Sequence, residues 1–146
     1  MPRPVVEITH CQEFSASHRL HNPKLSDEEN RRIFGMCNNP HGHGHNYVIE
    51  VTLRGTPAPE TDMLLDLNVL SSLVHEKIFS RVDHRHLNHD VPFLHGIVTT
   101  AENLAVAFWG QLEPSLQDIP GCTLHRIRVR ESQHNSAEYS GPKSPA

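Results

Sequence analysis

The chain has 146 residues, the length of one ordinary domain, and hydrophobic residues make up 36% of it. Its formal net charge of -4 at pH 7 argues against nucleic acid or an anionic membrane surface as the main partner. No apolar run approaches the roughly 20 residues of a membrane span. The N-terminal residues also lack the pattern of a secretory signal, so we expect a cytosolic protein that is not bound to a membrane.

Strand signals dominate the first part of the chain. Residues 5–18 are predicted to form one strand, and residues 46–55 form another because large apolar residues alternate there with polar ones. One face of this second strand would carry Tyr47, Ile49, Val51 and Leu53. Residues 19–45 join the two strands, and so long a connection in a compact domain is usually functional. A short helix is expected inside it at residues 25–30.

A helix is predicted over residues 67–81, after turn-forming residues 56–62. Asp66 fits its N-cap, although residues 63–66 could also begin or continue a strand. The apolar residues with helical spacing are Leu67, Leu70, Val74 and Ile78.

A second helix and a final strand complete the pattern. Thr99, with Glu102 three residues later, forms a capping box that opens a helix ending near Glu113. Residues 122–130 form the last strand. One of its faces would carry Leu124, Arg126, Arg128 and Arg130, and the other Ile127 and Val129.

The order of elements is strand, long loop, strand, helix, helix, strand, which is typical of an α+β fold with antiparallel strand pairs. We assign residues 1–139 to a single domain. Residues 140–146 are small and polar and are predicted to be disordered.

Histidine is over-represented, with 13 copies. His43 and His45 stand two apart at the start of the second strand, so their side chains point to one face. His18 ends the first strand, and antiparallel pairing would bring it beside them. Three neutral imidazoles with an open fourth position are typical of a catalytic zinc site. His41 and His43 form the same pattern two residues earlier. We favour His43 and His45 because they adjoin the strand.

Other residues carry weaker signals. Cys37 lies on the same loop, where a thiol near a metal cation can act as a base or nucleophile, or can close the site as a fourth ligand. Asp83 and His84 can form a base oriented by a carboxylate. Glu131 ends the last strand and can accept two parallel N–H donors from a ligand. A solvated surface position is the alternative for Asp83, His84 and Glu131.

Taken together, the chain resembles the animal type of the 6-pyruvoyl-tetrahydropterin synthases over residues 8–131. The strings that carry the resemblance are FSASHRL, LSDEEN, FGMCNNPHGHGHNY, VDHRHLNHDVPF, TTAENLAVAFW and RVRES. The resemblance implies the tunnelling fold, a four-stranded antiparallel sheet with two helices packed on one face. It further implies that three subunits join their sheets into a β-barrel and that two trimers stack as a homohexamer.

The resemblance also implies an activity and its metals. The expected substrate is 7,8-dihydroneopterin triphosphate, and the expected product is 6-pyruvoyl-tetrahydropterin, formed with elimination of triphosphate on the route to tetrahydrobiopterin. Zinc is the expected resident metal, and magnesium is associated with the activity. Because the family's pocket lies between subunits, the cysteine and the Asp–His pair are expected to act from different chains.

The family's functional residues carry over onto this sequence position by position. The zinc ligands fall on His18, His43 and His45. The catalytic base falls on Cys37, and its relay partners fall on Asp83 and His84. The pterin anchor falls on Glu131, and the lining of the pterin pocket falls on Thr100 and Glu102. By their position in the long loop, the candidates for binding the triphosphate are Arg19 and Lys24.

Two departures from the family and two alternatives remain. His41 stands where the family usually has another residue, and Ala101 stands where threonine is common. The alternatives are a 6-carboxy-tetrahydropterin synthase-like activity on the same substrate and a non-catalytic zinc-binding protein whose site is closed by Cys37. The spacing from Cys37 to the histidine pair and the long loop favour the pyruvoyl enzyme.

Overall fold

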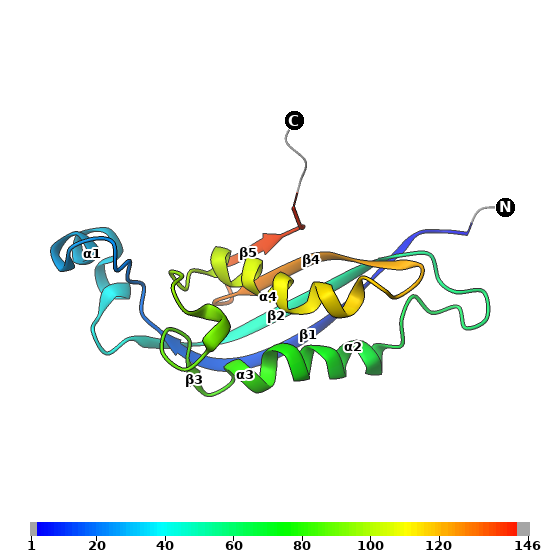
Figure 1. The fold of residues 1–146 in the computed structure, drawn as a ribbon, viewed down its shortest axis with the longest axis horizontal. Helices are drawn as coiled ribbons and strands as arrows, with labels where there is room; N and C mark the ends of the chain where they lie inside the picture. The colour runs from blue at the N-terminus through cyan, green and yellow to red at the C-terminus, as the bar shows by residue number, and fades with distance from the viewer. Residues whose placement is uncertain (1–2, 143–146) are drawn as a thin grey trace.

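The two longest strands, β1 (Val6–His18) and β2 (His43–Gly55), form an antiparallel pair at the centre of the sheet. β4 (Cys122–Arg130) pairs with the other edge of β2, and β5 (Ser136–Tyr139) lies beyond β4. β3 (Arg85–His86) lies on the free side of β1, so the strand order is β3-β1-β2-β4-β5 (Figure 1). The computed structural model describes residues 3–142.

The prediction of a four-stranded, wholly antiparallel sheet is wrong both in the number of strands and in their directions. The sheet is mixed and has five strands, because β3 runs parallel to β1. β3 pairs only with Ala16 and Ser17, and its pairing depends on chain that returns from the helices to the edge of β1. β5 adds a hairpin arm after a turn that follows β4. Both strands are too short to leave a clear alternating pattern in the sequence.

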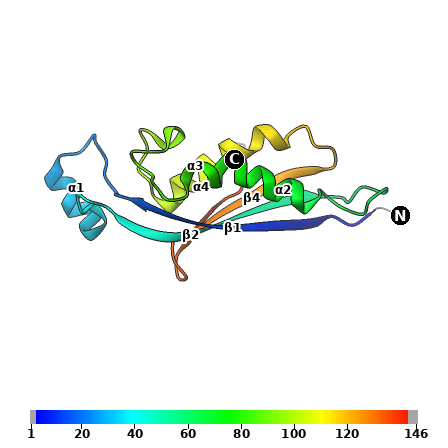
Figure 2. The same cartoon turned by 90° about the horizontal axis from the view of Figure 1, so that it is seen from below.

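The helices cover one face of the sheet. α2 (Leu67–Val74) continues through a π-helical turn, η2 (His75–Phe79), into α3 (Ser80–Val82), so the helix predicted over residues 67–81 is confirmed. α4 (Ala101–Leu116) lies beside it on the same face (Figure 2). The short 3-10 turn η3 (Pro92–Leu94) lies between them in sequence.

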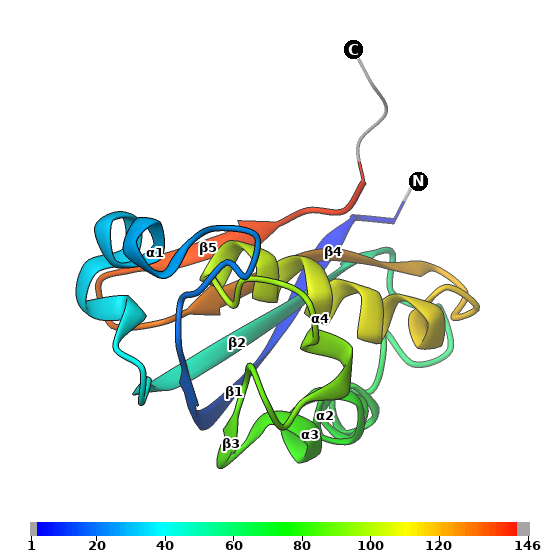
Figure 3. The ribbon, with the colours of Figure 1, turned by 60° about the vertical axis from the view of Figure 1, so that its left-hand side comes forward.

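A third helical segment lies away from this layer. α1 (Asp27–Phe34) and the 3-10 turn η1 (Gly35–Asn38) occupy the long connection between β1 and β2. They lie at the end of the sheet opposite the N-terminus (Figures 1 and 3). The predicted short helix is therefore present, although it begins and ends later than residues 25–30. The loop carries Cys37 back to the start of β2.

One of the two predicted helix N-caps is confirmed, and the other is wrong by one residue. Asp66 caps α2, because its Oδ1 accepts the N–H of Asn68 at 2.8 Å, and residues 63–66 form no strand. The cap of α4 is Thr100, whose Oγ1 accepts the N–H of Asn103 at 3.2 Å. The expected capping box at Thr99 is therefore wrong by one residue, and Thr99 is buried instead. α4 also runs past the expected end near Glu113.

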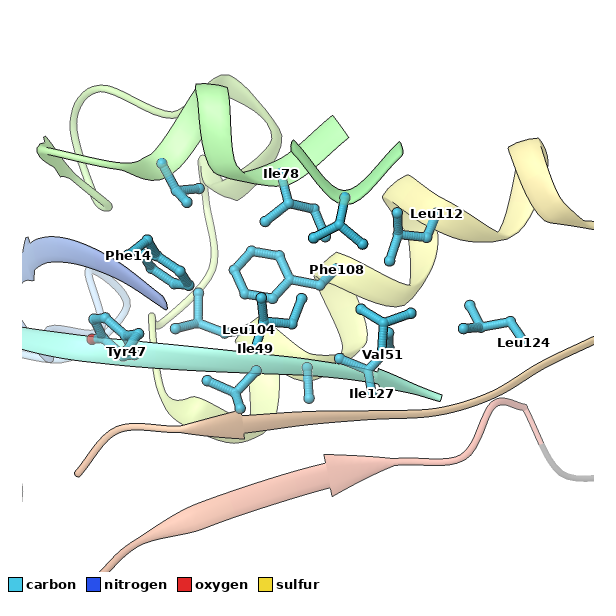
Figure 4. Close-up of a cluster of buried hydrophobic side chains, with 14 of the residues drawn as sticks. Phe14, Tyr47, Ile49, Val51, Ile78, Leu104, Phe108, Leu112, Leu124 and Ile127 are labelled. Atoms are coloured by element: carbon cyan, nitrogen blue, oxygen red, sulfur yellow. The ribbon is translucent and has the colours of Figure 1, made fainter. Parts of the chain in front are cut away.

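The core lies between the sheet and the helices (Figure 4). The four apolar residues that share the predicted inner face of β2 are fully buried: Tyr47, Ile49, Val51 and Leu53. The helices contribute fully buried residues that include Leu70, Val74, Ile78, Leu104 and Phe108. The Phe14 ring stacks on Tyr47 at 5.0 Å between centroids and meets Phe108 edge-on at 6.0 Å. Leu67, expected on the apolar face, is 53% exposed.

One irregularity changes the faces of β4. The register shifts between Thr52 and Leu53, where Leu53 pairs with Leu124 and Thr52 pairs with Arg126. The extra residue, His125, is a bulge that moves Leu124 onto the core face. Leu124 is accordingly only 6% exposed, so its expected place beside the arginines is wrong.

The division into a domain of residues 1–139 and a disordered tail of residues 140–146 stays a prediction. Gly141 is buried, and a Cβ atom there would lie 2.7 Å from Cζ2 of Trp109. Residues 143–146 of the predicted disordered tail lie outside the described residues. Within residues 3–142, no helix is both long and apolar enough to cross a membrane.

Candidate metal centre and active site

The ends of β1 and β2 bring together three histidines. His18 is the Cα partner of His43, and Ala16 is the partner of His45. Because residues two apart on a strand share a face, both β2 histidines stand on the same side as His18. The Nε2 atoms of His18 and His43 are 3.1 Å apart. The His45 ring centroid lies 5.1 Å from that of His18 and 4.8 Å from that of His43.

Glu131 joins this group from the residue after β4. Its Oε1 lies 3.2 Å from Nε2 of His45. One possible ligand atom from each of the three histidines and from Glu131 lies within 4.8 Å of every other. His41 is exposed and does not belong to the group. Of the two histidine pairs, the later one, at the start of β2, is therefore the pair whose possible ligand atoms cluster.

The protonation of His18 suits a metal ligand. Its Nδ1 lies 2.9 Å from the carbonyl oxygen of Thr99, which can only accept a hydrogen bond. Nδ1 therefore carries the hydrogen, and the lone pair of the neutral ring is on Nε2, which faces His43. Burial is the main cause that lowers the pKa of His18 to about 4, and the nearby histidines lower it further. A partner that holds the second ring nitrogen is typical of metal-ligating histidines.

His45 gives a second indication that the residues fit a cation. Its Nε2 is buried without a hydrogen-bond partner among the described residues, although a carboxylate oxygen lies 3.2 Å away. Burial lowers the pKa of His45, which favours the neutral ring. A neutral nitrogen lone pair and a carboxylate repel each other at this distance unless a proton or a cation lies between them. Three imidazoles and one carboxylate are a donor set that a divalent ion such as zinc accepts.

Cys37 lies in the 3-10 turn η1 and is half-buried. Its carbonyl oxygen accepts the N–H of Leu20 at 2.9 Å, which ties this turn to the residues that follow His18. Its thiol is not one of the clustered ligand atoms, whereas the Glu131 carboxylate is. The Cys37 thiol therefore lies outside the group of possible metal ligands.

Asp83 and His84 form a pair at the edge of β1. Asp83 Oδ2 lies 2.7 Å from Nδ1 of His84, and Asp83 Oδ1 accepts the N–H of Ser15 at 3.0 Å. His84 has a φ of 59°, a left-handed conformation that turns the chain at this point. The His84 side chain is 82% exposed. The carboxylate is therefore fixed to the sheet, while the imidazole that it orients faces solvent.

Asp83 leads to a pH-dependent prediction. Its pKa is lowered, first by the hydrogen bond from the Ser15 N–H and then by His84. A lowered folded-state pKa gives a stabilising contribution that is complete above the ordinary value of about 3.9 and is lost as the pH falls through the folded value. We expect Asp83→Asn to lower the urea midpoint at about pH 7, and the gap from wild type to shrink at about pH 3. Asp118→Asn, at an exposed site, is the control. An Asp83→Asn gap that is equal at both pH values would contradict this account.

The other residues predicted to bind substrate differ in their exposure and in their hydrogen bonds. Thr100 caps α4, and Glu102 is exposed in the first turn of that helix. Lys24 is exposed in the long loop. Arg19, by contrast, directs its guanidinium at Asn38, with Nε 3.0 Å from the carbonyl oxygen and Nη2 3.3 Å from Oδ1. Their roles as substrate ligands remain predictions.

Three residues of the site were not anticipated. Thr99, expected at a helix cap, holds His18 through its carbonyl oxygen. Asn38 and Asn88 hold the backbone around Leu20 and Arg19, respectively. The sequence shows only an asparagine after Cys37 and another in the histidine-rich segment, and neither position reveals its hydrogen-bond partners.

The fold and site define an α+β domain with a group of three histidines and a glutamate that could hold a metal ion, and with a cysteine on the preceding loop. The family model for 6-pyruvoyl tetrahydropterin synthase matches residues 7–142. A relative from Poecilia reticulata, 6-pyruvoyl tetrahydrobiopterin synthase, is 46% identical over 92% of this chain and 89% of its own length. The enzyme of the same name from Homo sapiens is 44% identical over 88% of this chain and 86% of its own.

A solved structure has the same fold as this chain. The Caenorhabditis elegans 6-pyruvoyl tetrahydropterin synthase superposes with a TM-score of 0.90 at 39% identity, covering 97% of this chain and 99% of that one. The chain belongs to the 6-pyruvoyl tetrahydropterin synthase family.

Proposed function

We propose that this protein converts 7,8-dihydroneopterin triphosphate to 6-pyruvoyl-tetrahydropterin with elimination of triphosphate, a step of tetrahydrobiopterin synthesis. The observation that carries the proposal is the convergence of His18, His43 and His45 at the end of the β1–β2 pair. It occurs in a chain whose curated relatives carry the name of that enzyme at up to 46% identity.

The proposed resident metal is zinc, held by the three histidines. When bound, zinc would supply Lewis acidity toward the hydroxyl oxygens of the substrate side chain. The tautomer that Thr99 imposes on His18 leaves the Nε2 lone pair directed at the site. The low pKa of His18 keeps that ring neutral near pH 7, which metal ligation requires. Magnesium is proposed as an additional requirement of the activity.

Side chains of the protein are proposed to carry out the proton transfers. Cys37 is proposed as the base that removes a proton from a side-chain carbon of the substrate. His84, oriented by Asp83 at 2.7 Å, would donate and accept protons as enol and ketone forms exchange. Because the His84 ring faces solvent, it is available to a site on another subunit.

Glu131 is the proposed anchor of the pterin ring. A cavity of about 600 Å³ is lined by Glu131, His45, Asn46 and Arg130 among others, and this volume suits a small-molecule ligand. A carboxylate in this wall can accept hydrogen bonds from the pterin amino group and ring N–H together. Thr100 and Glu102 are proposed to line the pterin pocket.

The proposed assembly is a homohexamer in which sheets join edge to edge. Within residues 3–142, β1 pairs on its outer edge only at Ala16 and Ser17. On the N-terminal side of Ser15, that edge presents backbone N–H and C=O groups that can pair with another chain. β5 ends the sheet on the opposite side and offers a second edge. The hexamer and a cytosolic location remain predictions.

Product analysis tests the activity and separates it from its alternatives. The purified protein is incubated with dihydroneopterin triphosphate, zinc and magnesium. Release of triphosphate with a three-carbon pyruvoyl product is expected. Release of acetaldehyde would instead identify a 6-carboxy-tetrahydropterin synthase-like enzyme. No turnover, combined with sulfur ligation of the metal, would identify a non-catalytic zinc protein.

A further inference from the structure

The residues that follow His18 and the turn that carries Cys37 lie side by side, although 17 or more positions separate them. The N–H of Leu20 donates to the carbonyl oxygen of Cys37 at 2.9 Å. Nδ2 of Asn38 returns a hydrogen bond to the carbonyl oxygen of Leu20 at 2.6 Å. Asn38 is only 2% exposed, so these bonds are shielded from competing water. These bonds close the long loop between the residues that follow His18 and the turn that carries Cys37.

Arg19 adds a side-chain clamp to this closure. Its Nε donates to the backbone carbonyl oxygen of Asn38 at 3.0 Å, and its Nη2 donates to Asn38 Oδ1 at 3.3 Å. The guanidinium thus makes two bonds, in fork geometry, to the residue immediately after Cys37. A lysine would carry the same charge but has no planar fork with which to form both bonds.

Asn88 connects the clamp to the histidines. Its Oδ1 accepts the N–H of Arg19 at 2.9 Å, and its Nδ2 donates to the Arg19 carbonyl oxygen at 2.8 Å. The same Oδ1 accepts the Thr99 hydroxyl at 3.2 Å, and the Thr99 carbonyl oxygen accepts Nδ1 of His18. A continuous set of hydrogen bonds therefore links the metal-ligand candidate to the turn of the thiol.

We propose that Arg19 is a positioning residue that, together with Asn38 and Asn88, holds the Cys37 thiol at a fixed place relative to the histidine group. This inference rests on the proposed function, in which Cys37 is the base. It gives Arg19 a role different from the triphosphate ligand that its loop position predicts. A misplaced base slows the proton-transfer step, whereas a lost phosphate ligand weakens substrate binding.

The two roles are separated by Arg19→Lys and Arg19→Ala, with Arg32→Ala on the exposed face of α1 as the matched control. For both Arg19 variants we expect kcat to fall by about 10- to 100-fold, with KM and inhibition by inorganic triphosphate within about twofold of wild type. The rate at which iodoacetamide alkylates Cys37, read by mass spectrometry, is expected to rise because the turn loosens. Alkylation of the exposed Cys11 serves as the internal reference.

The opposite pattern would overturn the proposal. In that pattern Arg19→Lys keeps wild-type kcat, while Arg19→Ala raises KM and weakens triphosphate inhibition without changing Cys37 alkylation. If wild-type protein shows no turnover, the proposed function fails on its own. The alkylation rates of Arg19→Lys and wild type then still test the clamp, and equal rates would refute it. Arg19→Lys serves for every measurement if Arg19→Ala does not fold.

Discussion

Replacing His43 with alanine is expected to weaken zinc binding by more than about 100-fold, whereas His41→Ala is expected to leave it unchanged. The difference follows from the strand register. His43 lies opposite His18 in the ladder, with 3.1 Å between their Nε2 atoms, while His41 is exposed outside the group. Loss of a residue behind a metal ligand already costs about 10- to 100-fold in affinity, so loss of a ligand costs more.

The measurement is a competition titration of each purified variant with a chromophoric zinc chelator, with metal content read independently by mass spectrometry. His43→Ala leaves the buried core untouched, and a parallel thermal melt of the metal-free proteins checks that the fold survives. Turnover should fall with metal content and return only in part at high zinc. Zinc binding lost in His41→Ala and kept in His43→Ala would show that the ligands follow the earlier histidine pair.

The histidine group could be anticipated because it depends on short-range rules. Alternation places His43 and His45 on one face of a strand, and antiparallel pairing of the adjacent strand brings in His18. The apolar face of β2 followed from the same alternation, and its residues are fully buried. Each of these steps needs only the period of a strand and one pairing partner.

The rest of the site depends on information that no local pattern contains. Glu131 reaches His45 only because β4 pairs with β2, in a register that a bulge at His125 shifts. Thr99 and Thr100 both satisfy the preferences of an N-cap, and tertiary contacts decide between them, since burial of Thr99 supplies the partner of His18. The short strands β3 and β5 form because they pair with β1 and β4, and not because their residues favour a strand.

The closure of the loop that contains α1 could not be predicted for a related reason. A connection of that length indicated function, but its closure by Arg19 and Asn38 involves residues 19 positions apart. Arginine in a loop near a triphosphate substrate favours a phosphate ligand on charge alone. The fork of hydrogen bonds to Asn38 is visible only once the two ends of the loop lie together.

Replacing Cys37 with alanine is expected to lower kcat by about 10²- to 10⁴-fold while zinc affinity stays at the wild-type value. Cys37 lies on a turn whose backbone is bonded to Leu20, two residues after His18, and its thiol is outside the set of clustered ligand atoms. Removal of a general base slows proton transfer and leaves all the metal ligands in place. The pair of readouts therefore distinguishes a base from a fourth ligand, which would lose metal and activity together.

Steady-state kinetics and the same chelator titration measure both quantities on one preparation. Cys11→Ala is the matched control, because Cys11 is an exposed thiol on β1, and it should retain wild-type kcat and zinc affinity. A second variant, Cys37→Ser, keeps the size of the side chain but replaces the thiol with a far weaker acid, so it should resemble Cys37→Ala in kcat. If Cys37→Ala lost zinc in parallel with activity, sulfur would be a ligand, the fourth position would be closed to substrate, and the catalytic role assigned to the three-histidine site would fail with it.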